Sequence, residues 1–317
     1  MKYIYICALV FSFALFFQNC EGSSSSNASL ALLAGSKALG SSSKPTGISF
    51  HAVVGDSEAV CGQEISGHGE SHSSSTVHAL HVAGVMPIGL KDLRFYVSEF
   101  ELVDENDNII VLNIPDNGTW QYSGVTLLDF ENATGSCTGT SDMNKIVQTA
   151  LENKQYKTIR FTLGVPESLN HIDYSTSPSP LNISGMAWGW TMGYRFFVGE
   201  FYSNDSLSPG NSAVLHLGSS GCTEPSPGTY SCANSNRARI ELSPIEGFNP
   251  ITQEIQFDLK KAFVGWDIST SGGGSKSCHS MGAMDSNCSV VYPNFGLDYS
   301  SGNSGSTAQS VFSIVSK

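Results

Sequence analysis

The sequence has few charged residues, and few of those are positive. Only 14% of its 317 residues are charged, and 16 Lys and Arg stand against 28 Asp and Glu. Nucleic-acid phosphates are bound by a basic face, and the sequence holds no basic cluster. The composition therefore argues against nucleic acid as a partner. With 40% hydrophobic and 10% aromatic residues, the chain has enough apolar surface to fold around a core.

The common catalytic signatures are also missing. There is no GxSxG, HExxH or phosphate-binding loop, and no GxGxxG on a strand-to-helix turn. The Asp and Glu residues are dispersed and form no evident acid/base pair. We therefore expect a protein that is not an enzyme and whose chemistry rests on His, Trp and Met.

An apolar run opens the chain, from Ile4 to Phe17 after Lys2, and it is too short to cross a bilayer as a helix. It predicts a signal peptide over residues 1–19. Cys20 follows directly, which predicts a bacterial lipoprotein of the cell envelope, lipidated at Cys20 and facing the periplasm or the cell surface. An ordinary secretory signal is the alternative, because the residues before Cys20 are bulkier than usual. Residues 20–47 are Ser-rich and predict a flexible tether.

The cysteine count fits export. Outside the signal peptide and Cys20, six cysteines remain, and an even number in an exported chain predicts disulfides. Two pairs are ten residues apart between turn residues and are expected to be local. The three expected disulfides are Cys222 with Cys232, Cys278 with Cys288, and the remaining Cys61 with Cys137. Thiolate metal ligation is not favoured, because no CxxC spacing exists.

Residues 48–317 read as a β domain. Six segments alternate apolar and polar residues with the period of a strand: 48–54, 93–103, 159–163, 213–217, 238–242 and 255–259. One helix is expected over 143–151, capped by Asp142. Gly, Pro, Asn and Ser turns separate the segments. The sequence therefore predicts a mainly β, single-domain β-sandwich with small helical insertions and three disulfides.

Small and large residues alternate between Gly185 and Phe196. If this segment is one strand, its large side chains share a face: Met186, Trp188, Trp190, Met192, Tyr194 and Phe196. A core role is the simpler interpretation for Tyr194 and Phe196. The two Trp and two Met are also electron-rich and oxidisable. Upstream, a loop presents His171 beside Asp173, a carboxylate that is able to orient a metal ligand.

Several ordered motifs between residues 48 and 297 resemble the MbnP-like family, the four-Cys half of the metallo-mystery pair. The matching pieces are Arg94-Phe95-Tyr96-Val97-Ser98, Trp120-Gln121, Leu127-Leu128-Asp129-Phe130-Glu131, Gly135-Ser136-Cys137, Gly164-Val165-Pro166, Leu169-Asn170-His171, Pro180-Leu181-Asn182, Met186-x-Trp188-x-Trp190-x-x-Gly193-Tyr194, His216-Leu217-Gly218-Ser219-Ser220-Gly221-Cys222 and the Cys278 to Cys288 pair.

The resemblance implies a copper-binding protein of the periplasm or cell surface. Members are similar in building the site from histidines and an oxidised tryptophan, kynurenine. A di-haem, cytochrome c peroxidase-like partner carries out the oxidation. Trp188 and Trp190 are the candidates for modification, with Trp120 as a competitor.

Three histidines are the candidate copper ligands, since neutral imidazole suits copper. His216 comes first, because it alternates with Ala213, Leu215 and Leu217 and so faces away from their core side. His51 and then His171 follow. A structural or merely exposed role is the alternative for each of them.

A separate Gly/Ser-rich loop carries four more histidines, His68, His72, His78 and His81, and departs from the family pattern. Such a loop is suited to weak, accessory binding of Cu(II), Zn(II) or Ni(II). A plain solvated loop whose charge varies with pH is the alternative.

Two other functions compete with copper binding. A surface adhesin or carbohydrate-binding β-sandwich would use exposed Trp188, Trp190 and Tyr202 to stack on sugars. A copper redox enzyme is the other. The leading hypothesis remains a lipid-anchored copper protein for metal acquisition or homeostasis.

Overall fold

The computed structural model describes residues 46–61, 64–66, 87–137, 139–189, 191–203, 212–265, 276–281, 285 and 287–317. Several predictions concern residues outside this set: the signal peptide, the tether, Cys20, Trp190, and the loop with His68, His72, His78 and His81. Residues 44–317 form one compact unit. Among the described residues, no helix is both long and apolar enough to cross a bilayer.

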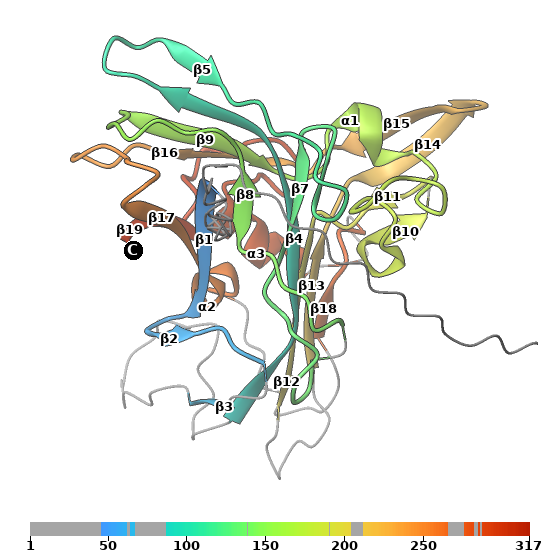
Figure 1. Cartoon of the computed structure of the whole chain (residues 1–317). Helices are drawn as coiled ribbons and strands as arrows, with labels where there is room; N and C mark the ends of the chain where they lie inside the picture. The colour runs from blue at the N-terminus through green and yellow to red at the C-terminus, as the bar shows by residue number, and fades with distance from the viewer. Residues whose placement is uncertain are drawn as a thin grey trace, which may run out of the picture. The chain divides into compact units, whose positions relative to one another are not determined.

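A five-stranded sheet forms one layer of the fold (Figure 1). Its central strand β1 pairs in parallel with β17 and antiparallel with β2 and β8, and β17 pairs with β19. The strands are β1 (Gly47–Val54), β2 (Ser57–Glu58), β8 (Ile146–Gln148), β17 (Gln253–Asp258) and β19 (Phe312–Ser316).

A ten-stranded sheet forms the other layer, in the order β16-β9-β4-β12-β13-β18 with four short strands attached. The main strands are β4 (Pro87–Val103), β9 (Thr158–Leu163), β12 (Phe197–Ser203), β13 (Ser212–Leu217), β16 (Ala238–Leu242) and β18 (Lys276–Cys278). The short ones are β3 (Glu64–Ser66), β5 (Ile109–Val111), β6 (Gln121–Tyr122) and β7 (Val125–Asp129).

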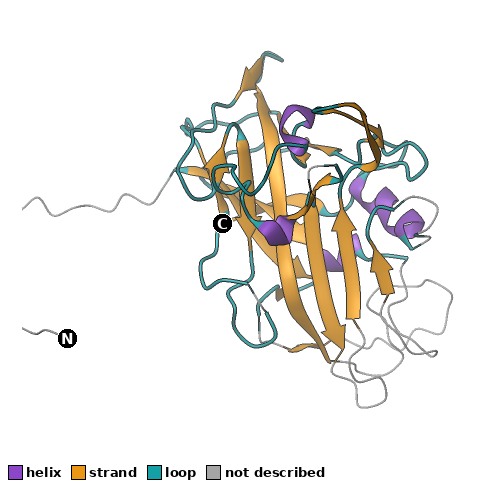
Figure 2. Ribbon diagram, turned by 90° about the vertical axis from the view of Figure 1, so that its right-hand side faces the viewer, coloured by secondary structure: helices purple, strands orange, loops and turns teal. Residues whose placement is uncertain are grey.

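Two hairpins and a few helical turns complete the described fold, and the helices lie beside the sheets (Figure 2). The hairpins are β10 (Ala187–Gly189) with β11 (Gly193–Tyr194), and β14 (Ser220–Ser226) with β15 (Thr229–Asn234). The helices are α1 (Glu167–Asn170), α2 (Leu259–Ala262), α3 (Cys288–Val291), η1 (Ser184–Met186) and η3 (Tyr292–Phe295).

Aromatic side chains fill the space between the two sheets. Phe95 of β4 has its ring centroid 6.4 Å from Phe50 of β1, 5.2 Å from Phe257 of β17 and 5.9 Å from Phe197 of β12. All four are buried, and each such side chain contributes about 1.5–3 kcal/mol through burial. The alternating strands thus pack as predicted, and the mainly β, single-domain sandwich is confirmed.

The outer face of the large sheet is covered as well. Tyr96 follows Phe95 on β4 and therefore points away from the sandwich core. It packs with Tyr194 and Phe196 in a second buried cluster. The Tyr96 hydroxyl donates to the carbonyl of Pro180 at 2.8 Å. Chain 166–196 therefore folds over part of this face, and the core role expected for Tyr194 and Phe196 is confirmed.

Two local predictions are wrong. Residues 143–151 form strand β8 and loops instead of a helix, because Val147 pairs with Ile48 at the sheet edge and is buried there. The segment from Gly185 to Phe196 is not one strand. It forms η1 and the β10–β11 hairpin, in which Ala187 pairs with Tyr194, so its large side chains do not share one face.

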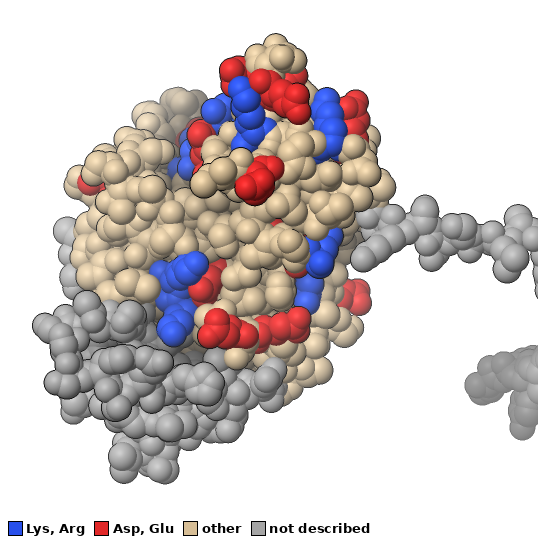
Figure 3. All heavy atoms as spheres, turned by 90° about the vertical axis from the view of Figure 1, so that its left-hand side faces the viewer, with Lys and Arg blue, Asp and Glu red and all other residues tan. Residues whose placement is uncertain are grey.

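The three expected disulfides are present. Their Cα atoms are 5.8 Å apart in Cys61–Cys137, 3.8 Å in Cys222–Cys232 and 5.0 Å in Cys278–Cys288. The face in Figure 3 shows Lys and Arg side chains next to Asp and Glu side chains, and most of that surface is uncharged.

Candidate metal centre

Two histidines meet on the outer face of the large sheet. Strands β13 and β18 run in parallel and pair Leu215 with Cys278. His216 follows Leu215 on β13 and His279 directly follows the last residue of β18, so the two histidines lie side by side. Their Nδ1 atoms are 3.1 Å apart, so the fold brings together two imidazoles separated by 63 residues.

His216 faces away from the sandwich core, as its alternation predicts. Leu215 and Leu217 on either side are fully buried in the core. The His216 side chain is still only 5% exposed, because the outer face is covered here too. Burial lowers the pKa of His216, and the nearby Arg195 lowers it further, so the ring is neutral at physiological pH.

Glu200 fixes the orientation of His216. His216 Nε2 lies 2.8 Å from Glu200 Oε1, and Lys91 Nζ donates to Glu200 Oε2 at 2.9 Å. The hydrogen bond from His216, with that from Lys91, lowers the pKa of Glu200 to about 2. An ionised carboxylate only accepts hydrogen bonds. His216 therefore carries its proton on Nε2 and presents the lone pair of Nδ1 to His279.

His279 is held by the chain that follows β18. Its backbone N–H donates to the carboxylate of Asp285. Ser280 Oγ donates to the carbonyl of His216 at 3.0 Å and accepts from the N–H of Gly218 at 3.2 Å. This bridge ties the His279 segment to the end of β13 and fixes the spacing of the two rings.

Trp188 lies at the same corner of the fold. The six-membered ring of its indole packs against Gly218, two residues beyond His216, where a Cβ atom would collide with Trp188 Cζ3. The guanidinium of Arg195 lies 5.8 Å from the indole centroid, and its Nη1 donates to the carbonyl of Gly185 at 3.0 Å. The half-buried indole and the histidine pair are thus joined through Gly218.

A row of paired residues crosses the sheet from His216 to Asp129, with the apolar Val198 and the charged Arg94 between them. Asp129 on β7 pairs with Arg94 on β4, Arg94 with Val198 on β12, and Val198 with His216. Paired residues share a face. Arg94 Nε donates to Asp92 Oδ1 at 2.7 Å. Burial raises the pKa of Asp129 to about 7, although Arg94 opposes this.

The other two predicted ligands lie in different surroundings. His51 sits on the five-stranded sheet, with its ring nitrogens 3.4 Å from Glu58 and 3.5 Å from Glu254. His171 Nε2 lies 3.3 Å from Cys232 Sγ. Among the described contacts, His216 is joined to His279, whereas His51 and His171 are placed in these other surroundings.

Three groups of close donor atoms contain cysteines, but each holds a disulfide. The groups are His171 with Cys222 and Cys232, Glu131 with Cys61 and Cys137, and Asp285 with Cys278 and Cys288. A thiolate is the sulfur form that ligates metals, so these groups are closed in the oxidised protein. Within the described part of the chain, the histidine pair is a donor set that no disulfide closes.

Sequence reasoning missed His279. It directly follows Cys278, after a run of Gly and Ser, and no alternating segment marked it. The preceding cysteine was the feature that could have indicated its orientation. Cys278 is buried on the core side, so the next residue of an extended chain faces outward, as His216 does after Leu215.

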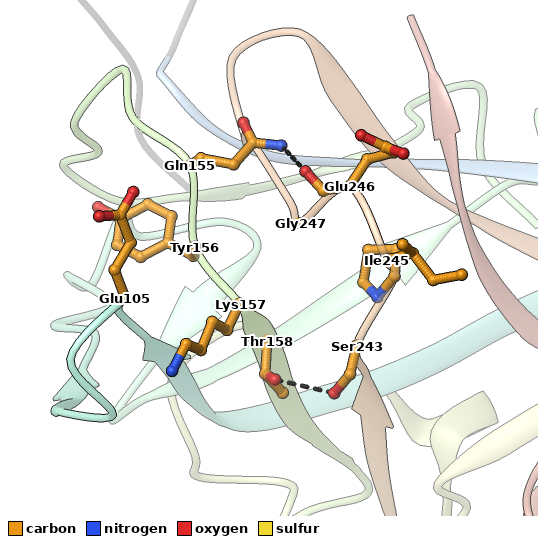
Figure 4. A pocket seen from close by; sticks show the side chains of 10 residues that line it. Glu105, Gln155, Tyr156, Lys157, Thr158, Ser243, Ile245, Glu246 and Gly247 are labelled. Atoms are coloured by element: carbon orange, nitrogen blue, oxygen red, sulfur yellow. Dashed lines mark hydrogen bonds between the residues drawn. The ribbon is translucent and has the colours of Figure 1, made fainter.

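A surface pocket lies elsewhere, between the start of β9 and the loop after β16 (Figure 4). Thr158 Oγ1 and Ser243 Oγ are 2.8 Å apart at its base. Gln155 Nε2 donates to the carbonyl of Glu246 at 2.5 Å. Its lining contains neither His nor Cys, so it is not the metal centre.

Comparison with known proteins identifies the family of the chain. Residues 43–280 match the MbnP family, a range that contains His216 and His279. The chain belongs to the MbnP family. The solved structure of MbnP from Methylosinus trichosporium aligns with 26% identity and a TM-score of 0.64, covering 86% of this chain and 98% of that one. No curated protein matches the chain. Membership in the MbnP family supports a metal-associated protein, as the sequence resemblance predicted.

Proposed function

We propose that this protein is an exported, lipid-anchored copper-binding protein of the bacterial cell envelope. It serves metal acquisition or homeostasis and is not an enzyme, so copper is its cargo. The signal-like N-terminus with Cys20, the three disulfides and membership in the MbnP family support this proposal.

The observation that carries the proposal is the separation of the two imidazole nitrogens. His216 Nδ1 and His279 Nδ1 are 3.1 Å apart. First-row metals hold imidazole nitrogen at ~2.0–2.1 Å, so two nitrogens on one ion lie about 3–4 Å apart. The pair therefore fits one ion with little rearrangement, and neutral imidazoles are ligands that copper accepts.

The hydrogen bond on the other ring nitrogen of His216 resembles the one commonly found on a metal-ligating histidine. A metal-ligating His commonly donates its other N–H to a carboxylate, which fixes the ring and raises its basicity. Glu200 does this for His216. With the lone pair of His216 on Nδ1, His279 donates its Nδ1–H to it. A cation held by both Nδ1 atoms would require that proton to move to Nε2 of His279 or to solvent.

We assign the modified tryptophan to Trp188. Its indole packs on Gly218, beside the histidine pair. Opening of the indole to kynurenine leaves an aryl ketone and a free aniline, which add oxygen and nitrogen donors next to the two imidazoles. The oxidation is assigned to a di-haem, cytochrome c peroxidase-like partner. Trp120 packs instead against the second hydrophobic cluster.

Copper analysis of ligand variants tests the site. His216→Ala and His279→Ala are each expected to lose bound copper, because one imidazole alone does not hold the ion. His51→Ala is the matched control, since His51 lies on the other sheet between two glutamates. Thermal unfolding confirms that each variant folds. Unchanged copper stoichiometry in either site variant removes the pair from the proposal.

Peptide mass analysis tests the modification. Protein produced with its partner is expected to carry the mass of kynurenine on the Trp188 peptide, and Trp188→Phe abolishes that signal while Trp120→Phe retains it.

Glycan binding that does not depend on metal would instead favour the carbohydrate-binding alternative.

Membrane attachment tests the anchor. Wild-type protein is expected to partition with detergent, and Cys20→Ser protein with the aqueous phase, because the acyl chains are lost. Equal partitioning of the two would contradict lipidation at Cys20.

A further inference from the structure

The β14–β15 hairpin carries the most accessible disulfide among the three. Cys222 and Cys232 are half-buried, whereas the other four disulfide cysteines are at most 6% exposed. The hairpin projects from the body of the protein, with α1 beside it (Figure 1). A reductant therefore reaches Cys222–Cys232 before the other two bonds.

An imidazole lies against this disulfide. His171, directly after α1, has its Nε2 3.3 Å from Cys232 Sγ, and all three donor atoms of His171, Cys222 and Cys232 lie within 4.8 Å of one another. The His171 ring stacks on Tyr230 of β15, with centroids 4.8 Å apart and planes at 15°. Its side chain is only 6% exposed, so the ring is held beside the sulfurs.

Asn170 determines which form of the imidazole is present. Asn170 Oδ1 accepts from the backbone N–H of Tyr194 at 3.0 Å, which fixes the orientation of the amide. Its Nδ2 then faces His171 Nε2 at 3.1 Å. An amide nitrogen only donates, so Nε2 is unprotonated. The lone pair of His171 therefore lies on the nitrogen next to Cys232.

The hairpin keeps the two sulfurs together without their bond. Cys222 and Cys232 are direct partners across the strands, and the pairs Ser220–Asn234 and Thr223–Ser231 flank them. At the base, Ser219 Oγ donates to the carbonyl of Ser235 at 2.9 Å. Because the strands stay paired, both cysteine side chains remain on the face next to His171 after the disulfide is reduced.

We infer that Cys222, Cys232 and His171 form a second metal site, closed by the disulfide and opened by reduction, for a thiophilic d10 cation such as Cu(I) or Zn(II). Two thiolates and one imidazole are a donor set that such ions prefer. Glu167 Oε1 lies 3.7 Å from His171 Nε2, and its negative charge favours a cation here. This site is separate from the histidine pair and independent of it.

The opening step is a thiol–disulfide exchange. A dithiol reductant supplies two electrons and two protons and itself becomes a disulfide, while the Cys222–Cys232 bond breaks to give two thiols. The cation then displaces both thiol protons to solvent, because thiolate is the ligating form. In the reverse direction, a disulfide oxidant accepts the two electrons and is itself reduced to a dithiol, which restores the Cys222–Cys232 bond and releases the ion.

Metal titration of oxidised and reduced protein tests the inference. The full folded protein is reduced with a mild dithiol, freed of it by anaerobic gel filtration, and titrated with Cu(I) against a chromophoric chelator. Reduced protein is expected to bind one more equivalent than oxidised protein. Co(II), used in place of Zn(II), is expected to give a thiolate charge-transfer band only after reduction. Equal binding by the two forms, or no such band, overturns the inference.

Variants separate this site from the first one. His171→Ala keeps the disulfide and is expected to weaken the extra equivalent by roughly tenfold or more, whereas His51→Ala does not. His216→Ala leaves the extra equivalent in place even if the proposed copper site fails. Alkylation of briefly reduced protein is expected to label Cys222 and Cys232 first. Unchanged affinity in His171→Ala, or first labelling of another pair, contradicts the inference.

Discussion

At the scale of single residues, the candidate metal centre depends on which ring nitrogen of each histidine carries the proton. Alternation along β13 identified His216 as outward-facing before its contacts were known. The sequence does not predict that Glu200 accepts from Nε2, because that contact requires the pairing of β12 with β13. The sequence did not predict the role of His279 for the same reason, because the parallel pairing of β18 with β13 brings it next to His216.

Glu200→Gln tests the orienting role. The amide keeps the shape of the carboxylate but loses the charge that makes it an obligate acceptor. We expect copper affinity to fall by about 10- to 100-fold, with unchanged stoichiometry at saturation, as measured by chelator competition. Glu241→Gln, which removes an exposed partner of Arg160, is the control. Equal affinities in wild type and Glu200→Gln would mean that Glu200 does not orient His216.

Gly218→Ala tests the contact between Trp188 and β13. The added methyl group would collide with Trp188 and lie 2.6 Å from the carbonyl oxygen of Tyr194, a backbone atom that yields little. We expect about 1–3 kcal/mol of lost stability and a shift in tryptophan fluorescence. Gly185→Ala, whose methyl group would meet Arg94 Nη2 at 3.4 Å, is the control. A variant with wild-type stability would show that the indole is not packed there.

At the scale of secondary structure elements, apolar–polar alternation with a period of two predicted strands correctly. The helical spacing of apolar residues at 143–151 predicted a helix that does not form. All six alternating segments coincide with strands. The expected helix at 143–151 had the right spacing of apolar residues, yet Val147 gains more by pairing with Ile48 and filling the core. Between Gly185 and Phe196, the turn after Gly189 breaks the alternation, and Gly193 has a positive φ of 79°.

Asp129 on β7, which pairs with Arg94 on β4, is expected to make stability depend on pH. The folded state raises the pKa of Asp129 from 3.8 to about 7, mainly through burial. The folded chain therefore binds this proton more tightly than the unfolded chain. The stabilisation it confers is complete below about pH 4 and is lost as the pH rises through 7.

Asp129→Asn is expected to remove this dependence, because the amide stays neutral and its oxygen still accepts from Glu131 N–H. Relative to the variant, wild type should lose unfolding free energy between about pH 4 and pH 7. Denaturant unfolding at several pH values measures it. Parallel curves for the two proteins would show that Asp129 does not bind its proton in the folded state.

At the scale of the whole molecule, composition and cysteine count predicted the sandwich and its three disulfides. The arrangement of the functional side chains was not predictable in the same way, because it depends on pairings between distant strands. Two separate sheets carry His51 and His216, and no pattern along the chain distinguishes them. Both histidines alternate with apolar neighbours, and the family resemblance, one of whose motifs begins at His216, favoured His216 over His51.

The long-range disulfide is expected to stabilise the fold most. Cys61 and Cys137 are separated by 76 residues, and Cys222 and Cys232 by only 10. Closing the longer loop restricts the unfolded chain more, so the Cys61→Ala/Cys137→Ala variant should lose about 3–5 kcal/mol. The matched Cys222→Ala/Cys232→Ala variant should lose less. Denaturant unfolding compares them, and a larger loss in the second variant would contradict this account.

The position of β18 also sets an order of events. His279 comes after nearly nine-tenths of the polypeptide has been synthesised, and it reaches its companion only when β18 docks as the last strand of its sheet. The histidine pair therefore does not exist until β18 has paired with β13, so it forms only in the folded chain. In the proposed copper protein, metal binding would follow this pairing, because an unfolded chain offers the ion only single, separated imidazoles.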